Sequence, residues 1–185
     1  MIREIVNVNE SWGIGSGGDM LLFLPEDMKY FRQKTKEAVV IMGRSTLESF
    51  PRMAPLKNRI NIVLTGNVSN IRPECFSEAE EAAKRGEETR LVIVSSLEDA
   101  LSEAAKYPEK EIYVIGGGMI YNQFLPYCDE CLVTVNDFQA EADTWFPNLS
   151  ELADWYEADA GEPQVSETGV HYRFTVWKRI KTDQE

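Results

Sequence analysis

Short apolar segments recur along the chain, separated by stretches in which apolar residues return with helical spacing. The apolar segments are rich in β-branched residues and lack polar alternation, which is typical of strands buried on both faces of a mainly parallel sheet. They cover residues 2–8, 39–42, 60–64, 91–94, 112–115 and 131–135. Helical patterns lie between them, at residues 25–36, 44–49, 97–106 and 118–125. This alternation of strands and helices predicts an α/β domain.

The C-terminal part of the chain follows a different pattern. Residues 154–161 (DWYEADAG) and 169–180 (GVHYRFTVWKRI) alternate between polar and apolar positions with a period of two. This predicts an antiparallel pair of strands that closes one edge of the sheet. Residues 66–90 are polar and irregular, and we predict a short helix at 77–85 within them. We expect a single domain over residues 1–180, followed by a polar tail at 181–185.

Composition and charge narrow the possible classes of protein. With 185 residues, 43% of them hydrophobic and 27% charged, the chain has the balance of a globular domain with a substantial core. It has no apolar run of about 18 residues and no signal-peptide core, so we expect a cytoplasmic protein without a membrane span. The net charge of -12, from 31 acidic and 19 basic residues, argues against binding to nucleic acid or an anionic membrane. A phosphorylated ligand would need a locally basic pocket.

The three cysteines do not suggest a disulfide framework, because their number is odd. Cys128 and Cys131 form a C-x-x-C pattern, and Cys75 lies far from them in the sequence. A zinc site would require a second pair or histidines, and the sole histidine, His171, lies far along the chain. We therefore expect structural cysteines and no metal site.

The stretch GIGSGG, residues 13–18, matches the G-x-G-x-x-G pattern that binds a dinucleotide pyrophosphate. That fingerprint requires a helix to open at the third glycine, so that its first N–H groups face the phosphates. Here Gly18 is followed by DMLLFL before Pro25, the first residue suited to a helix N-terminus. We therefore predict a flexible loop at residues 13–18 and not a phosphate cradle.

Asp27 falls on the apolar stripe of the predicted helix in LPEDMKYF, residues 24–31. A carboxylate on that side costs free energy unless a partner satisfies it. In one interpretation, the helix dipole and first-turn N–H groups stabilise it. In the other, it lies in an apolar cleft and binds a cationic or N–H-rich ligand. Burial would raise the pKa of Asp27 and the helix N-terminus would lower it, and the sequence leaves that balance open.

Two further segments follow buried strands. In VVIMGRSTLES, residues 39–49, Arg44, Ser45 and Thr46 lie where a helix is expected to begin, and they suggest an anion site. Ser45 and Glu48 also fit a capping box, which is compatible with that site. In IYVIGGGMIYNQFL, residues 112–125, three glycines between a strand and a helix allow close approach of a ligand. Ligands of α/β sheets bind at such carboxyl ends of strands.

These motifs occur in a fixed order with other short segments. The full set is WGIG (12–15), LPEDMKYF (24–31), VVIMGRSTLES (39–49), PLKNRINIVLT (55–65), VIGGGMIY (114–121), VTVND (133–137) and ADTWFP (142–147). Together they resemble the dihydrofolate reductase family, from about residue 2 to 178. The resemblance implies a single domain with an eight-stranded, mostly parallel sheet, an antiparallel C-terminal edge hairpin and helices on both faces.

The resemblance also implies an activity, the reduction of 7,8-dihydrofolate to 5,6,7,8-tetrahydrofolate by hydride transfer from NADPH. This reaction supports one-carbon metabolism and nucleotide synthesis. Two alternatives remain: the pyrimidine reductase of riboflavin synthesis, which has a similar fold, and a catalytically silent folate- or nucleotide-binding protein. The family tendency is a monomer that binds dihydrofolate and, in the same pocket, antifolate inhibitors.

By resemblance, Asp27 would bind the 2-amino group and N3 of the pterin ring, and Thr134 would form a hydrogen bond to Asp27. Arg59 would bind the α-carboxylate of the substrate's glutamate. The GIGSGGDM segment would be a mobile loop that closes over the nicotinamide. The folate slot would be lined by Ile5, Val6, Met20, Met28, Phe31, Ser49 and Phe50.

The resemblance places the cofactor pyrophosphate against residues 43–46 and 116–118, with a cis peptide between Gly116 and Gly117. Arg44 favours NADPH over NADH. The cofactor contacts that it implies are Val6, Ile14, Gly43, Arg44, Ser45, Thr46, Leu64, Thr65, Ile115, Gly116, Gly117, Gly118, Met119, Ile120 and Tyr121.

The chain departs from the family pattern at a few positions. Leu21 and Leu22 stand where many members carry Pro-Trp, which affects the expected water network near the pterin. Gly66 and Asn67 stand where members that prefer NADPH often have an Arg or Ser pair. Residues 74–90 have the character of an insertion, with no role that the sequence assigns.

Overall fold

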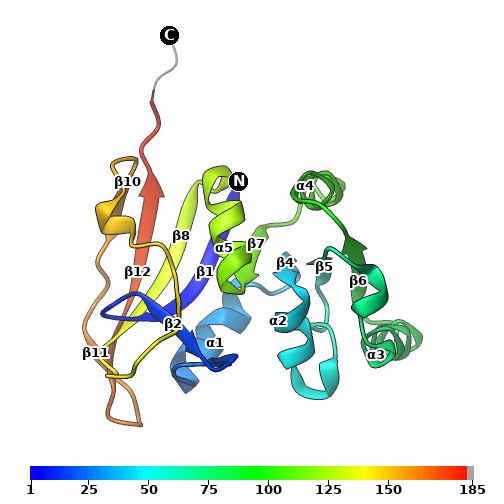
Figure 1. Ribbon diagram of the computed structural model, residues 1–185, viewed down its shortest axis with the longest axis horizontal. Coiled ribbons are helices and arrows are strands. Elements are labelled where there is room, and N and C mark those ends of the chain that lie inside the picture. Colours follow the sequence, from blue (N-terminus) through cyan, green and yellow to red (C-terminus); the bar gives the residue numbers. More distant parts are fainter. Residues whose placement is uncertain (183–185) are drawn as a thin grey trace. The chain divides into compact units, whose positions relative to one another are not determined.

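The computed structural model describes residues 1–182, and the chain forms two compact units (Figure 1). The first unit combines residues 1–32 with the chain from residue 125 onward, and the second comprises residues 33–124. Of the polar tail expected at 181–185, residues 183–185 lie outside the described residues.

Four strands of the first unit follow one another in the order β10-β12-β8-β1. Strand β1 (Ile2–Asn9) pairs in parallel with β8 (Glu130–Asn136). Strand β12 (His171–Arg179) runs antiparallel to β8 and to β10 (Trp155–Asp159), and the short β11 (Gln164–Val165) also pairs with β12. The antiparallel C-terminal pair predicted from the period-two pattern is therefore confirmed.

The second unit contains four parallel strands in the order β7-β4-β5-β6. They are β4 (Val39–Gly43), β5 (Ile60–Leu64), β6 (Arg90–Val94) and β7 (Ile112–Gly116). Every residue of β4 is buried, as expected for a strand covered on both faces. Each apolar segment singled out in the sequence is thus a strand, and the α/β class with mostly parallel pairing is confirmed.

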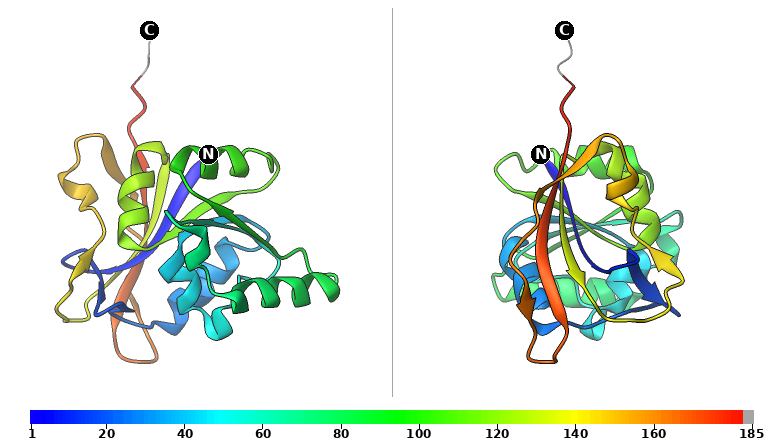
Figure 2. Two further views of the ribbon diagram at one scale, coloured as in Figure 1. Left: turned by 45° about the vertical axis from the view of Figure 1, so that its right-hand side comes forward. Right: turned by 90° about the vertical axis from the view of Figure 1, so that its left-hand side faces the viewer.

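Helices cover both sides of the strands in the second unit. Figures 1 and 2 show α4 (Leu97–Ala104) on one side of β5 and β6, and α2 (Arg44–Ser49) and α3 (Pro73–Lys84) on the other. The steps from β4 to β5 and from β5 to β6 run one way across the sheet, and the step from β6 to β7 runs back. Right-handed crossovers therefore place α4 opposite to α2 and α3.

The remaining helices are short or lie at the unit boundary. Helix α1 begins at Pro25 and α5 follows β7. Their bounds, with those of the 3₁₀ turns, are α1 (Pro25–Lys34), α5 (Gly118–Phe124), η1 (Pro51–Met53), η2 (Val68–Asn70), η3 (Leu125–Tyr127) and η4 (Leu149–Glu151). No helix within residues 1–182 is both long and apolar enough to cross a bilayer.

The GIGSGG stretch forms a β-hairpin and not the loop that the sequence predicted. Strands β2 (Gly13–Ser16) and β3 (Asp19–Met20) flank a turn at Gly17 and Gly18, whose φ angles of 62° and 86° favour glycine. Strand β9 (Thr144–Trp145) pairs with β2. No helix opens at Gly18, so the dinucleotide fingerprint is a false match, as predicted.

Helix α3 is longer than the helix predicted at 77–85. It begins at Pro73, which suits a helix N-terminus, and it buries Cys75 and Ala82. The sequence prediction missed its first turn because that turn lies in a polar, irregular stretch. Cys128 and Cys131 are also buried, and none of the three cysteines forms a disulfide.

Candidate functional site

Asp27 is the third residue of α1 and the one residue of that helix that is buried, with 8% of its surface exposed. Thr134, which is fully buried in β8, donates a hydrogen bond of 2.6 Å from Oγ1 to Asp27 Oδ1. Within residues 1–182 this hydroxyl is the hydrogen-bond partner of the Asp27 side chain, and it binds Oδ1, one of the two carboxyl oxygens. The predicted position of Asp27 on the core-facing side of the helix is confirmed.

Burial determines the pKa of Asp27. Desolvation raises this pKa from 3.8 to about 6, and the hydrogen bond from Thr134 opposes the rise only in part. The neighbouring Glu26 behaves differently, because it accepts hydrogen bonds from Glu167 N and Ser166 Oγ and its pKa is lowered. Glu26, and not Asp27, is thus the first-turn acid satisfied by N–H and O–H donors.

Several other residues expected at the folate slot belong to the same unit as Asp27. Ile5 and Val6 of β1 are buried, and Met28 and Phe31 of α1 are half-buried. Met20, at the end of the hairpin, is 57% exposed. This set therefore contains buried positions on β1 and α1 together with one exposed residue of the hairpin.

Two polar residues near Asp27 were not singled out from the sequence. Asn7 of β1 pairs in register with Thr134. Tyr30 of α1 stacks on Phe174 at 4.1 Å, and burial followed by the charge of Asp27 raises its pKa to about 12. The sequence carries only a weak signal for Asn7, since Arg3 and Glu4 are also polar positions within the first apolar segment.

The second unit assembles the predicted phosphate-binding residues at the carboxyl ends of β4, β5 and β7. In the strand register Gly43 lies beside Leu64, and Met42 lies beside Gly116. The peptide bond between Gly116 and Gly117 is cis, as the family resemblance implied. Thr65 follows β5, Ile115 lies in β7, and residues 118–121 form the first turn of α5.

Close packing explains the glycines at this edge. A Cβ atom added at Gly43 would lie 3.1 Å from Ile120 Cγ1, and one at Gly116 would lie 3.2 Å from the Tyr121 ring. Gly116 also has a φ of 119°, which L-residues with a side chain rarely adopt. A Cβ at Gly117 would lie 3.7 Å from Thr46 Oγ1. The start of α2 and the glycine turn are therefore direct neighbours.

The capping box proposed for Ser45 and Glu48 is wrong. Helix α2 begins at Arg44, and its N-cap residue is Gly43, which provides no side-chain cap. Ser45 and Thr46 are therefore first-turn residues and not caps. The Arg44 side chain donates a hydrogen bond from Nη1 to the Asn70 carbonyl at 3.3 Å. Met119, at the start of α5, is 77% exposed.

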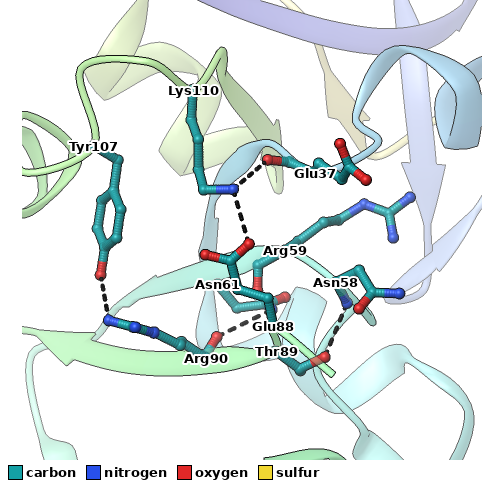
Figure 3. Close-up of polar contacts among 9 residues, drawn as sticks. All are labelled: Glu37, Asn58, Arg59, Asn61, Glu88, Thr89, Arg90, Tyr107 and Lys110. Atoms are coloured by element: carbon teal, nitrogen blue, oxygen red, sulfur yellow. Dashed lines mark hydrogen bonds and ion pairs between the residues drawn. The ribbon is translucent and has the colours of Figure 1, made fainter. Parts of the chain in front are cut away.

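Arg59 lies immediately before Ile60, at the amino end of β5 (Figure 3). Its Nε donates to the carbonyl and to Oγ1 of Thr35, at 3.0 and 3.1 Å, and its Nη1 donates to the Lys57 carbonyl at 2.7 Å. These bonds fix the guanidinium, so Arg59 is not simply a solvated surface charge. Ser49 and Phe50, at the end of α2, belong to the same unit.

Asn61 organises the same end of β5. Its side-chain oxygen accepts from Leu56 N at 2.9 Å, and its Nδ2 donates to the Arg90 carbonyl at 3.1 Å. Around it, Lys110 pairs with Glu88, and Arg90 donates to the Tyr107 hydroxyl (Figure 3). The backbone that carries Arg59 is therefore held from several directions.

Comparisons with known proteins agree with this arrangement. A family model described as dihydrofolate reductase matches residues 1–179, and the chain belongs to the dihydrofolate reductase family. It is 35% identical over 178 residues to the dihydrofolate reductase of Neisseria meningitidis serogroup B, covering 96% of this chain and 98% of the relative. It is 34% identical over 170 residues to the dihydrofolate reductase of Mycobacterium tuberculosis strain H37Rv, covering 90% of each chain.

A longer relative matches over one part of its length. The bifunctional dihydrofolate reductase-thymidylate synthase of Glycine max is 31% identical over 196 residues, which cover 97% of this chain and 34% of the relative. The similarity to this relative thus concerns about a third of its length.

Proposed function

We propose that this chain reduces 7,8-dihydrofolate to 5,6,7,8-tetrahydrofolate with NADPH, and that Asp27 is the residue that holds the reacting ring. The chain is an oxidoreductase of the dihydrofolate reductase family. The observation that carries the assignment to Asp27 is its burial on α1, with Thr134 on one carboxyl oxygen. A carboxyl group in this setting is suited to a ligand that presents two N–H donors side by side.

Asp27 accepts hydrogen bonds from the 2-amino group and N3 of the pterin, while Thr134 fixes the rotation of its carboxyl group. NADPH supplies, when bound, the hydride that adds to pterin C6. N5 must then receive a proton, and Asp27 is occupied at N3. The sole histidine, His171, is exposed on β12. A water molecule is therefore the proton donor in this proposal, and Asp27 acts electrostatically.

Residues 43–46 and 116–118 fit a dinucleotide pyrophosphate. The glycines themselves carry no side chain at this edge, and the first turns of α2 and α5, with their N–H groups, begin there. Arg44 adds a positive charge in a protein with a net charge of -12. It is the group we assign to the 2′-phosphate, which distinguishes NADPH from NADH. The further cofactor contacts are Val6, Ile14, Leu64, Thr65, Ile115, Met119, Ile120 and Tyr121.

Arg59 binds the α-carboxylate of the substrate's glutamate in this proposal, because its guanidinium is fixed by backbone carbonyls and Thr35. The apolar part of the substrate contacts Ile5, Val6, Met20, Met28, Phe31, Ser49 and Phe50. Antifolates bind the same residues. We further propose one family domain over residues 1–180, acting as a cytoplasmic monomer without nucleic-acid partners.

The test is to mix the protein with dihydrofolate and NADPH and to follow the loss of reduced-nicotinamide absorbance. We expect turnover with dihydrofolate and none with the pyrimidine substrate of riboflavin synthesis. The reverse preference would reject the proposal, and so would binding without turnover.

With NADH as donor, KM should be higher than with NADPH, and Arg44→Ala should raise KM for NADPH while leaving KM for NADH nearly unchanged. An equal effect on both donors would reject the role of Arg44.

A further inference from the structure

Asn7 interrupts the buried part of β1 with a polar, half-exposed side chain. All residues of the strand from Glu4 to Asn9 are buried except Asn7. Asn7 is paired in register with Thr134 on the neighbouring parallel strand, so the two side chains lie on the same face, with the strands about 4.8 Å apart. Thr134 is the residue that binds Asp27. Asn7 therefore lies beside the residue that binds the carboxyl group that we assign to the substrate ring.

Hydrogen bonds determine which way the Asn7 amide points. Phe138 N donates to Asn136 Oδ1 at 3.0 Å, and Asn136 Nδ2 donates to the Val8 carbonyl at 3.0 Å. A backbone N–H can only donate and a carbonyl can only accept, so the orientation of Asn136 is fixed. Its Nδ2 also donates to Asn7, at 2.8 Å, and the accepting atom must be Oδ1. The Nδ2 group of Asn7 is consequently at the opposite side of the amide.

That Nδ2 group is only weakly used by the protein. It carries two N–H bonds and donates to the Leu22 carbonyl at 3.5 Å, the outer limit of a hydrogen bond. Leu22 follows the β2–β3 hairpin. A half-exposed side chain thus offers N–H groups from a fixed position beside Thr134, the hydrogen-bond partner of Asp27.

We propose that Asn7 is a substrate-binding residue, whose Nδ2 donates to pterin N1 while Asp27 holds the 2-amino group and N3. The edge of the ring presents two donors, N3–H and the 2-amino group, followed by an acceptor, N1. A carboxylate matches the two donors, and an amide N–H next to the carboxylate matches the acceptor. This inference rests on the proposed function and extends it to the third position of the same ring edge.

The direct test compares Asn7→Leu with Asn136→Leu. Asn7→Leu keeps the side-chain volume and removes the N–H donors. Asn136→Leu breaks the same bond between the two amides and also loses the bonds to Val8 and Phe138, but it retains the N–H donors of Asn7. Each variant is assayed for kcat, for KM of dihydrofolate and of NADPH, and for its melting temperature.

We expect Asn7→Leu to raise KM for dihydrofolate by about 3- to 10-fold, the factor that corresponds to one neutral hydrogen bond, with KM for NADPH within about two-fold of wild type. Asn136→Leu should lower the melting temperature more and raise KM for dihydrofolate less. The inference is overturned if KM for dihydrofolate in Asn7→Leu stays within about two-fold of wild type. It is also overturned if Asn136→Leu raises this KM as much, or if only KM for NADPH changes. A wild-type protein without turnover would instead reject the proposed function.

Discussion

Thr134 donates a 2.6 Å hydrogen bond to Asp27 across 107 positions of the sequence, and it thereby joins β8 to the first turn of α1. The partner is a hydroxyl group and not a cation. Within residues 1–182 no Lys or Arg forms an ion pair with Asp27, so a ligand is the group that can offset its charge. A buried carboxyl left in this state costs stability, and such groups are concentrated at functional sites.

Asp27 should make the stability of the ligand-free protein depend on pH. Its folded-state pKa of about 6 lies above the ordinary 3.8, so its contribution to stability is complete below about pH 4 and is lost as pH rises to about 6. Relative to Asp27→Asn, the wild-type free energy of unfolding should fall by at most about 3 kcal/mol across this range. Urea unfolding at several pH values measures it. A difference between the two proteins that does not change with pH would contradict the burial argument.

Arg59→Ala should raise KM for dihydrofolate by at least about 10-fold and change kcat much less, because a charge-assisted hydrogen bond to the glutamate carboxylate is lost. Arg90→Ala is the matched control. Arg90 is the first residue of β6 and pairs in register with Ile60, the residue after Arg59. Its side chain donates to the Tyr107 hydroxyl (Figure 3). Steady-state kinetics of both variants decide the matter. Equal KM values in Arg59→Ala and wild type would remove the tail-binding role.

Glu4 should also make stability depend on pH, from the other face of β1. It is fully buried beside Cys131, and neither carboxyl oxygen has a hydrogen-bond partner of ordinary geometry within residues 1–182. Burial raises the pKa of Glu4 well above 4.5, and the Cys128 thiol and the Arg179 guanidinium oppose this rise without cancelling it. Arg179 is itself occupied by Asp154 and the Cys128 carbonyl.

Because the folded-state pKa of Glu4 is raised, its stabilising contribution is present below about pH 4.5 and is lost as pH rises toward the folded value. The glutamine of Glu4→Gln cannot titrate. The free energy of unfolding of this variant minus that of wild type should therefore increase by about 1.4 kcal/mol for each pH unit above pH 4.5. Glu157→Gln, at an exposed position of β10, is the control and should track wild type. Parallel pH profiles for Glu4→Gln and wild type would disprove a neutral Glu4.

The sequence predicted most of the fold because the buried parallel strands are nearly pure apolar runs. Strand β5 has the predicted bounds of 60–64, and α2 has the predicted bounds of 44–49. The hairpin at Gly13–Met20 was missed because its strands are only four and two residues long and rich in glycine, which hides any alternation. Its pairing with β9 is a tertiary contact that no local pattern records.

The candidate site was predictable to a similar degree. The position of Asp27 on a helical face followed from residue spacing, but the pKa of about 6 depends on how completely neighbouring elements exclude water. Likewise, the orientation of the Asn7 amide follows from Asn136, which is 129 positions away. Such contacts depend on strand register between distant segments, which local sequence patterns do not reveal.

The most direct measurement is kcat/KM for dihydrofolate in Asp27→Asn at neutral pH, compared with wild type and with Glu26→Gln. We expect a loss of at least about 100-fold for Asp27→Asn, the scale of removing a preorganised electrostatic group. Glu26→Gln changes the adjacent carboxyl group, which binds Ser166 and Glu167, and it should stay close to wild type. A folded Asp27→Asn protein with near-wild-type kcat/KM would show that Asp27 does not hold the substrate ring.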